Sequence, residues 1–321
     1  QTMINKGIYP ALLTPFKEDN SVDYDALSDL IEFNIAKGVS GFYVTGSTAE
    51  VFMLTSEERK NVMKTVYETV RGRCSLIAHV GCIGTDDAIS YGKYAEKLGF
   101  DAISSVPPFY YNFPKSAIME YYKDISSHVD LPMIVYNIPA FSGVSFTIED
   151  IDLLLSDSRI IGVKNTANDY FIMEKMKRHN PDKIIFNGYD ETYLAGLSMG
   201  ADGAIGSTFN FMAEKFIRMK AYFEDGNIDA AKKEQNEANI IIEALCSVGV
   251  MQGEKAILRE LGINVGKCRR PFMEISKEKE RDFIEQMYLF SLSDCLRPRF
   301  IRISGFSHLS QNADECCHIF F

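Results

Sequence analysis

One lysine in the sequence has the surroundings of a nucleophile. Lys164 ends the apolar run 160–163, so its side chain starts from an apolar wall. Removing the amine from water would lower its pKa and leave it uncharged, and a neutral amine can attack a ketone to form a Schiff base. A Schiff base draws electrons from a nearby carbon–carbon bond, so such a lysine can make or break that bond. From this run alone, the commoner alternative is a lysine that extends past the strand end and keeps its charge in water.

Three further groups of polar residues could act on a carbonyl substrate. Tyr136 stands near the end of an apolar run and offers a phenol that can shuttle a proton, although a buried tyrosine is more often a packed aromatic with a bonded hydroxyl. The segment 46–48 (Gly-Ser-Thr) offers backbone N–H groups and two hydroxyls that suit a carboxylate, or it is a plain strand-to-helix turn. Asp190 and Glu191 could accept hydrogen bonds from sugar hydroxyls, or they could be a charge pair at the start of a helix.

The sequence indicates no metal ion and no organic cofactor. The segment 262–268 is one residue short of a phosphate-binding loop and lacks its Ser or Thr. His79 and Cys82 are close in the sequence, but no further ligands accompany them, so we expect no metal there. The segment 316–318 (Cys-Cys-His) is a weak candidate for metal or redox chemistry, and a disordered tail is the simpler interpretation.

Short apolar runs alternate with helical patterns and would position these residues. The runs are continuous, as expected for parallel strands buried on both faces, and their ends lie about 27 residues apart between Thr14 and Gly206, the length of one strand–helix unit. Eight such units close naturally into a (β/α)8 TIM barrel, whose active site lies at the carboxyl ends of the strands. A doubly wound sheet is the alternative, but no glycine-rich turn follows the first run. The predicted strands are 8–14, 41–45, 76–81, 102–106, 133–137, 160–164, 184–188 and 203–206.

After Gly206 the sequence shows only helical patterns, at 215–225, 230–248, 254–261 and 277–290. We therefore expect a barrel over residues 1–226, with the active site at the carboxyl ends of its strands. We expect C-terminal helices over residues 227–290, packed on the barrel. Residues 291–321 hold no lysine and three of the seven cysteines, and we expect an atypical tail that is disordered or artefactual.

Composition excludes several classes of partner. The chain has 34 lysines and arginines against 44 aspartates and glutamates, a formal net charge of −10. Nucleic acid and anionic membranes require a basic face, so we expect neither as a partner. No apolar run reaches the roughly 18–20 residues of a membrane-spanning helix. The seven cysteines show no CxxC spacing, which favours reduced thiols and a cytoplasmic location.

Four ordered motifs resemble those of the dihydrodipicolinate synthase / N-acetylneuraminate lyase superfamily, and the resemblance runs from about Gly7 to about Phe290. Within it, the chain is more similar to the N-acetylneuraminate lyase branch. The other branch has an arginine shortly after the proline of the second motif, where this chain has Ala140 and Phe141. The motifs are 46–50 (GSTAE), 136–140 (YNIPA), 162–164 (GVK) and 203–207 (GAIGS), and the segments 78–82 and 187–191 also resemble the lyase branch.

The resemblance implies a class I aldolase, a homotetramer without metal or cofactor, that cleaves N-acetylneuraminate reversibly to N-acetylmannosamine and pyruvate in sialic acid catabolism. It implies that Lys164 forms the Schiff base and that Tyr136 transfers the proton at the C4 hydroxyl. Tyr110 would support Tyr136, in this fold from a neighbouring subunit. The pyruvate carboxylate would be held by Ser47 and Thr48. The sugar part would contact Thr166, Gly188, Asp190, Glu191 and Ser207.

Two alternatives stay open at this point. One is another pyruvate-dependent enzyme of the superfamily, acting on a different 2-keto-3-deoxy sugar acid or carrying out a dihydrodipicolinate synthase-like condensation. The other is a barrel that only binds sugar acids or regulates, against which the intact Lys164 and Tyr136 argue. One departure concerns Ala49, which stands where the superfamily usually has glycine. If that position has a positive φ, alanine costs about 1 kcal/mol and the carboxylate-binding loop would shift.

Overall fold

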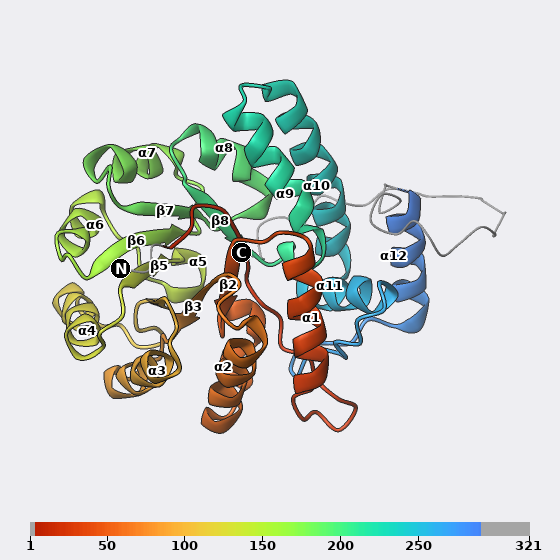
Figure 1. Ribbon diagram of the computed structural model, residues 1–321, viewed down its shortest axis with the longest axis horizontal. Coiled ribbons are helices and arrows are strands. Elements are labelled where there is room, and N and C mark those ends of the chain that lie inside the picture. The colour runs from red at the N-terminus through yellow and green to blue at the C-terminus, as the bar shows by residue number, and fades with distance from the viewer. Residues whose placement is uncertain (1–3, 290–321) are drawn as a thin grey trace.

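Eight parallel strands form a barrel with the helices arranged around it (Figure 1). The computed structural model describes residues 4–289. The strand order is β1-β8-β7-β6-β5-β4-β3-β2, and the ring closes where the backbone N–H of Leu12 donates to the carbonyl of Tyr43 at 3.0 Å. The predicted (β/α)8 barrel is confirmed. The strands are β1 (Ile8–Pro10), β2 (Gly41–Val44), β3 (Ser75–His79), β4 (Ala102–Ser105), β5 (Met133–Asn137), β6 (Ile160–Asn165), β7 (Ile184–Asn187) and β8 (Gly203–Gly206).

The first strand is shorter than the predicted 8–14. It ends at Pro10, and the backbone N–H of Leu13 donates to the side-chain oxygen of Asn210 at 3.2 Å. Because this side chain takes the place of a neighbouring strand, regular pairing stops there. The other seven strands match the predicted runs, with ends displaced by no more than about two residues.

The core has two parts, which explains why the strands are apolar on both faces. Side chains including Tyr9, Ile134 and Phe186 fill the inside of the barrel, and Tyr9 packs edge to face on Phe186 at 5.3 Å between ring centres. A larger apolar layer lies between the strands and the surrounding helices. The filled interior leaves only the carboxyl ends of the strands available for a site.

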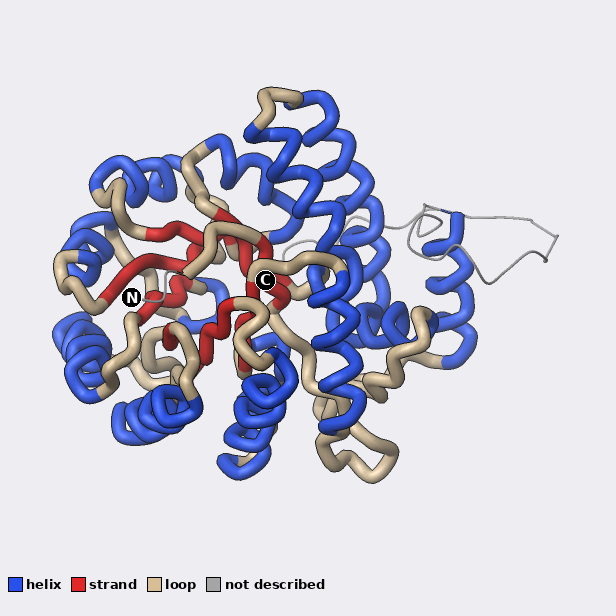
Figure 2. Tube along the Cα trace, in the orientation of Figure 1, coloured by secondary structure: helices blue, strands red, loops and turns tan. Residues whose placement is uncertain are grey.

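The helices surround the strands and are joined to them by short loops (Figure 2). The cap of α2 shows how the sequence sets their ends: Thr55 accepts from the backbone N–H of Glu58 at 3.2 Å, and Glu58 accepts from that of Thr55 at 2.8 Å. The helices are α1 (Tyr24–Ala36), α2 (Ser56–Val70), α3 (Thr85–Leu98), α4 (Lys115–His128), α5 (Pro139–Ser142), α6 (Ile148–Leu155), α7 (Tyr170–His179), α8 (Tyr193–Ser198) and α9 (Phe209–Glu224), with short 3₁₀ turns η1 (Ser47–Ala49), η2 (Val51–Met53) and η3 (Asp190–Thr192).

Three further helices form the predicted C-terminal addition: α10 (Ile228–Val248), α11 (Val250–Glu260) and α12 (Lys277–Leu289). In Figure 1, α10 lies along α9, and α12 lies against α10 and α11. Helix α9 begins at residue 209 instead of 215, and α11 begins at 250 instead of 254. The division between a barrel at 1–226 and helices at 227–290 stays a prediction. Phe290 and the predicted tail 291–321 lie outside the described residues.

A buried ion pair links α11 to the loop that follows β2. The Nζ of Lys255 lies 2.8 Å from Oε1 of Glu50, and both side chains are completely buried. Lys255 also donates to the carbonyls of Thr14 at 2.9 Å and Lys267 at 3.0 Å. The other oxygen of Glu50 accepts from the backbone N–H of Arg269 at 2.7 Å. Each charge therefore has hydrogen-bond partners, as burial requires.

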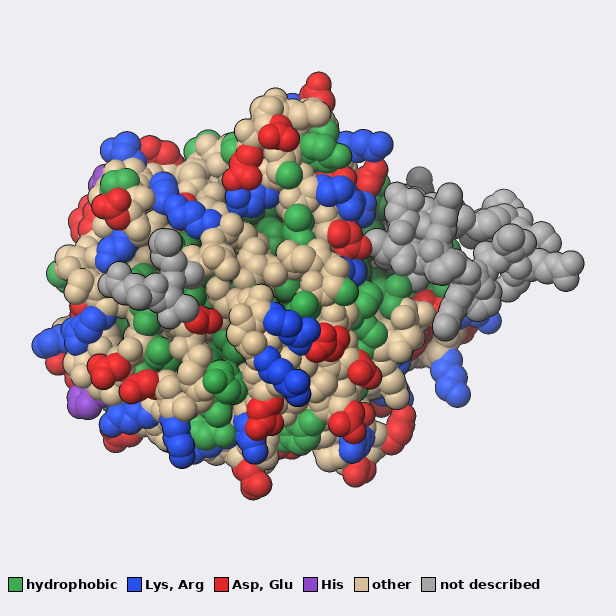
Figure 3. All heavy atoms as spheres, viewed as in Figure 1, with side chains coloured by type: hydrophobic (Ala, Val, Ile, Leu, Met, Phe, Trp, Pro, Cys, Tyr) green, Lys and Arg blue, Asp and Glu red, His purple; other side chains and the backbone are tan. Residues whose placement is uncertain are grey.

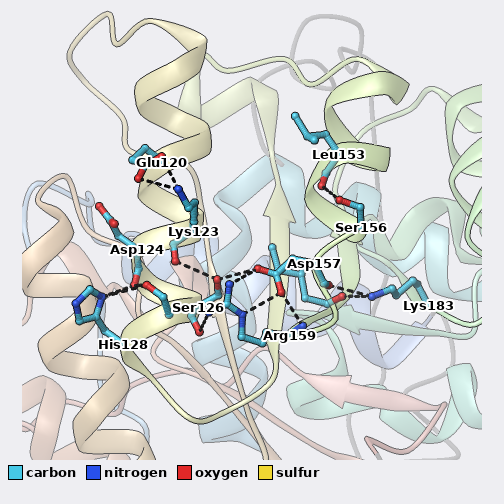
Figure 4. A network of polar contacts seen from close by, with 12 residues as sticks. Glu120, Lys123, Asp124, Ser126, His128, Leu153, Ser156, Asp157, Arg159 and Lys183 are labelled. Atoms are coloured by element: carbon cyan, nitrogen blue, oxygen red, sulfur yellow. Dashed lines mark hydrogen bonds and ion pairs between the residues drawn. The ribbon is translucent and has the colours of Figure 1, made fainter.

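A polar network fixes where β6, the strand of Lys164, begins (Figure 4). Arg159 donates to the carboxylate of Asp157 at 3.0 and 2.6 Å, and to the carbonyl of Ser126 in α4 at 3.1 Å. Lys183, just before β7, donates to the carbonyl of Asp157 at 3.2 Å. The Arg159 guanidinium lowers the pKa of Asp157 to about 2. The network joins α4 to the starts of β6 and β7, at the opposite end of β6 from the lysine.

The surface carries charges of both signs, interspersed on the face shown in Figure 3. Within residues 4–289, no helix has the length and apolar character needed to cross a membrane. The cysteines of this part of the chain, Cys74, Cys82, Cys246 and Cys268, are all outside disulfide bonds.

Replacing Lys255 by Met should destabilise the fold, because Glu50 would keep a buried charge without its partner. We expect the free energy of unfolding, measured by urea denaturation, to fall by about 3–5 kcal/mol. The double variant Lys255→Met/Glu50→Gln should recover part of this loss. Lys64→Met is the control, because the Lys64–Glu68 pair is 54% and 61% exposed, and it should leave the midpoint unchanged. A Lys255→Met protein as stable as the wild type would show that the pair does not hold α11.

Candidate active site

Lys164 lies at the mouth of the barrel between two aromatic rings. The pairing of β5, β6 and β7 sets Tyr136, Lys164 and Phe186 side by side. Lys164 is 4% exposed. Its Nζ lies 3.8 Å from the centre of the Tyr136 ring and 4.5 Å from that of Tyr43. The alternative of a lysine that extends into water is therefore wrong.

Burial lowers the pKa of the Lys164 amine from 10.5 to about 7. The ammonium form loses its hydration, which is the larger effect, and the nearby Asp190 carboxylate acts in the opposite direction and limits the fall. The flanking rings attract the ammonium form but do not replace its water. With such a pKa, about half of the amines are neutral at pH 7. The amine is thus available as a nucleophile.

Tyr136 presents a buried phenol next to this amine. It is 3% exposed, and its ring packs edge to face with Tyr43 and His79, at 5.9 and 6.0 Å between ring centres. Burial raises the pKa of the phenol to about 12 and outweighs the opposing effect of the neighbouring Ser47 and Thr166 hydroxyls. At neutral pH the phenol keeps its proton, so it can both donate and accept a hydrogen bond, as proton transfer requires.

The turn after β2 brings Ser47 and Thr48 to the same mouth. Both residues lie in η1, where Thr48 is buried and Ser47 is half-buried. Gly46 precedes them because a Cβ at that position would lie 2.7 Å from the ring of Tyr43. The hydroxyl of Ser47 is close enough to Tyr136 to influence its pKa. The segment is a 3₁₀ turn at the site, and its role in binding a carboxylate stays a prediction.

The condition under which Ala49 would strain the backbone, a positive φ, is not met. Ala49 lies inside η1, and the positive φ, 55°, falls on the next residue, Glu50. A left-handed conformation costs a residue with a side chain roughly 1–2 kcal/mol, and the buried contacts of Glu50 with Lys255 hold it there. The carbonyl of Ala49 accepts from the hydroxyl of Thr14 at 2.7 Å. Alanine at this position therefore carries no left-handed backbone strain.

Asp190 and Glu191 follow β7 and form η3. Asp190 is buried, and its Oδ2 accepts from the backbone N–H of Thr208 at 2.9 Å and from its hydroxyl at 2.6 Å. Burial raises the pKa of Asp190 to about 6 and that of Glu191 to about 7. Two amides of α10 hold the turn: Gln235 donates to the carbonyl of Asp190 at 3.1 Å and Asn239 to that of Glu191 at 3.0 Å. Both acids stand in the first turn of a helical segment, as the alternative expects, and their contact with a sugar stays a prediction.

Thr166, Gly188 and Ser207 complete the predicted set. A Cβ on Gly188 would lie 1.8 Å from the Thr166 hydroxyl, so the glycine leaves room for it. That hydroxyl is buried and close enough to the Tyr136 phenol to lower its pKa, but it makes no hydrogen bond of normal geometry with the described residues, which is uncommon for a buried polar group. Ser207 is 3% exposed and lies 2.6 Å from the carboxyl of Glu254, a residue to which no sequence pattern pointed.

The structure does not bring Tyr110 into this buried cluster. Tyr110 is 84% exposed, and its ring packs edge to face on that of Tyr111 at 5.0 Å between centres. Its φ of 74° is unusual for a bulky residue. Support of Tyr136 by this residue therefore stays a prediction.

Sequence reasoning missed three buried residues that shape the site. Tyr43 flanks the lysine amine. His79 bonds through Nδ1 to the carbonyl of Thr45 at 2.9 Å, and burial holds its pKa well below the usual value. Arg59 donates to the carbonyl of His79 at 2.8 Å and to the sulfur of Cys82 at 3.2 Å. Their position in the sequence could have indicated Tyr43 and His79, because both stand at or near strand ends, where the side chains of a barrel meet.

The fold and the site define a (β/α)8-barrel protein with a desolvated lysine amine beside a protonated tyrosine at the carboxyl ends of its strands. The chain belongs to the dihydrodipicolinate synthetase family, whose sequence model matches residues 5–287.

Similar proteins match most of this chain. The chain is 43% identical over 272 residues to the N-acetylneuraminate lyase of Rhizobium meliloti, a match that covers 85% of this chain and 91% of that protein. The N-acetylneuraminate lyase of Fusobacterium nucleatum complexed with pyruvate is 38% identical, with a TM-score of 0.85 and coverage of 90% and 98%. A catalytic lysine mutant of the Ruminococcus gnavus sialic acid aldolase is 30% identical, with a TM-score of 0.88 and coverage of 92% and 98%.

Thr166→Val tests whether this hydroxyl is kept for a ligand. Valine has nearly the same shape, and the hydroxyl it removes is near Tyr136 but makes no hydrogen bond of normal geometry with the described residues, so the free energy of unfolding should stay within about 1 kcal/mol of the wild type. Thr208→Val is the matched control, because that hydroxyl donates to Asp190, and its loss should cost about 1–3 kcal/mol. Urea denaturation measures both. Equal losses would assign the Thr166 hydroxyl a structural role.

Proposed function

We propose that this protein is a class I aldolase that cleaves N-acetylneuraminate reversibly to N-acetylmannosamine and pyruvate. The observation that carries the proposal is the buried amine of Lys164, whose pKa is near 7 and whose Nζ lies 3.8 Å from the centre of the Tyr136 ring. A Schiff base requires a neutral amine, and the adjacent phenol can move the proton that bond cleavage releases.

The first step would use the lysine. The neutral amine of Lys164 attacks the C2 ketone of the open-chain sugar acid, and loss of water leaves an imine. Once protonated, the imine nitrogen can accept the electron pair of the C3–C4 bond. The rings of Tyr43 and Tyr136 flank this nitrogen and would stabilise its positive charge.

The second step would use the phenol. As the C3–C4 bond breaks, Tyr136 accepts the proton of the C4 hydroxyl, whose oxygen becomes the carbonyl of the aldehyde product. Because the pKa of the phenol is about 12, Tyr136 passes its own proton on as it accepts the new one, and the neighbouring Ser47 hydroxyl can take part in this relay. The enamine left on Lys164 then gains at C3 the proton that Tyr136 has passed on, and hydrolysis of the resulting imine by water releases pyruvate and restores the amine.

The remaining site residues would hold the two parts of the substrate. Ser47 and Thr48 in η1 supply hydroxyls and backbone N–H groups for the carboxylate of the pyruvate part. A single carboxylate bound this way is compatible with the net charge of −10, since local donors act at short range. The sugar part would contact Thr166, Gly188, Asp190, Glu191 and Ser207.

The similar proteins support this substrate over the alternatives. The R. meliloti relative is named N-acetylneuraminate lyase, and the F. nucleatum structure of that name holds pyruvate. A dihydrodipicolinate synthase-like condensation is less well supported, because Ala140 and Phe141 leave no arginine after Pro139 to hold a second carboxylate. A barrel that only binds sugar acids would not need a lysine amine without its charge.

We further propose a cytoplasmic homotetramer in which Tyr110 reaches the site of a neighbouring subunit. The ring of Tyr110 is 84% exposed, and its left-handed backbone costs a residue with a side chain roughly 1–2 kcal/mol. A contact with a neighbouring subunit would offset that cost. The thiols of residues 4–289, which form no disulfides, support a reducing compartment.

Pyruvate and sodium borohydride together should leave a stable adduct on Lys164, because reduction traps the imine. Mass spectrometry of peptides should find the adduct on Lys164 and not on the exposed Lys64, which serves as the internal control. Lys164→Ala should lose both the adduct and measurable pyruvate release, while its circular dichroism spectrum stays that of the wild type.

Substrate choice is measured as the rate of pyruvate release from each member of a panel of sialic and 2-keto-3-deoxy sugar acids. We expect N-acetylneuraminate to be the preferred substrate. Preference for another keto-deoxy acid would favour the other aldolase, and a wild-type protein without an adduct on Lys164 would refute the Schiff base.

A further inference from the structure

A second buried acid lies directly behind the site, on a helix of the C-terminal addition. Glu254 in α11 is 0% exposed, and its Oε1 lies 2.6 Å from the hydroxyl of Ser207. Its other oxygen, Oε2, has no hydrogen-bond partner among the described residues. The proposed reaction steps do not use this carboxyl group.

Other groups hold the backbone of Ser207. Asn210 donates to the carbonyl of Ser207 from its side chain at 2.7 Å and from its backbone at 3.1 Å. The next residue, Thr208, is held by Asp190. Within residues 4–289, the one hydrogen bond of the Glu254 carboxyl is with the Ser207 hydroxyl, so a change at Glu254 can redirect this hydroxyl while the other bonds hold the loop.

The protonation of Glu254 decides what the Ser207 hydroxyl offers to a ligand. A carboxylate only accepts, so Ser207 would give its hydrogen to Glu254 and offer a ligand lone pairs. A protonated Glu254 donates to Ser207, and the hydrogen of Ser207 is then available to a ligand. Burial raises the pKa of Glu254 to about 8, so the acid form prevails at neutral pH.

Three ionisable groups on different segments face Glu254. Asp190 in η3 raises the pKa of Glu254, and Lys255 on the same helix lowers it. Lys255 forms an ion pair with Glu50 at 2.8 Å, and this pairing limits how far Lys255 lowers the pKa of Glu254. Cys268 follows α11, and burial raises the pKa of its thiol to about 12, so it stays neutral. Burial exceeds each of these influences on Glu254.

We propose that Glu254 is a positioning residue that makes the Ser207 hydroxyl a hydrogen-bond donor toward an acceptor oxygen on the sugar part of the substrate. The inference rests on the proposed function, because it takes Ser207 to contact that part. It would make α11 a determinant of specificity, since a donor at this point favours substrates that present a carbonyl or hydroxyl oxygen to Ser207.

The test compares the KM for N-acetylneuraminate of the wild type, Glu254→Gln and Glu254→Leu between pH 6.5 and 9.5. The wild-type KM should rise about three- to tenfold as Glu254 ionises above pH 8, the loss expected for one hydrogen bond. Gln has the same shape and can donate from its amide at every pH, so this alkaline rise should be missing. Leu cannot donate, so the KM should be about three- to tenfold higher at every pH. In each case kcat should change little.

A double-mutant cycle separates positioning from packing. In a Ser207→Ala background, Glu254→Leu should have no further effect on KM. Pyruvate and borohydride should label Lys164 equally in the wild type and both Glu254 variants, because pyruvate lacks the sugar part. Absence of labelling in the wild type would overturn the proposed function itself. Two results would overturn the role of Glu254 while labelling stays intact. One is a KM of Glu254→Gln that rises at alkaline pH as much as the wild-type KM does. The other is a Glu254→Leu substitution that raises KM as much in the Ser207→Ala background as in the wild type.

Discussion

The site depends on keeping water away from one lysine amine. Three neighbouring strands set Tyr136, Lys164 and Phe186 in a row, and Tyr43 covers the amine from another strand. Asp190 supplies a carboxylate whose attraction partly offsets the loss of hydration. A more exposed amine, or one in direct contact with a carboxylate, would stay protonated and could not attack a ketone. The pKa of about 7 therefore results from burial and one moderate opposing charge together.

The C-terminal helices are part of this site and not only a cover for the barrel. Helix α10 supplies Gln235 and Asn239, which hold the acidic turn η3. Helix α11 supplies Lys255, which secures the loop after β2, and Glu254, which bonds to Ser207. The turn that we propose to bind the carboxylate and the residue Ser207 that we propose to contact the sugar part thus depend on the same helix. Loss of this helix would be expected to disturb both ends of the substrate.

The barrel could be predicted because its strands, buried on both faces, read as continuous apolar runs. Lys164 and Tyr136 could be placed at its mouth because both stand at the ends of such runs. The approach of Tyr43 to the amine could not, because β2 and β6 lie on opposite sides of the barrel and no local pattern contains that relation. Glu254 was equally hidden, since it follows Ser207 by 47 residues on a helix whose apolar pattern gives no reason to bury an acid.

The pKa of Lys164 is the most direct measure of this desolvation. An NMR titration of protein with ¹³C-labelled lysine side chains reports it, with the Lys164 signal assigned from its absence in the Lys164→Ala spectrum. The structure predicts a midpoint near pH 7. A midpoint near the ordinary 10.5 would mean that the amine is hydrated and charged, and would contradict its role as the nucleophile.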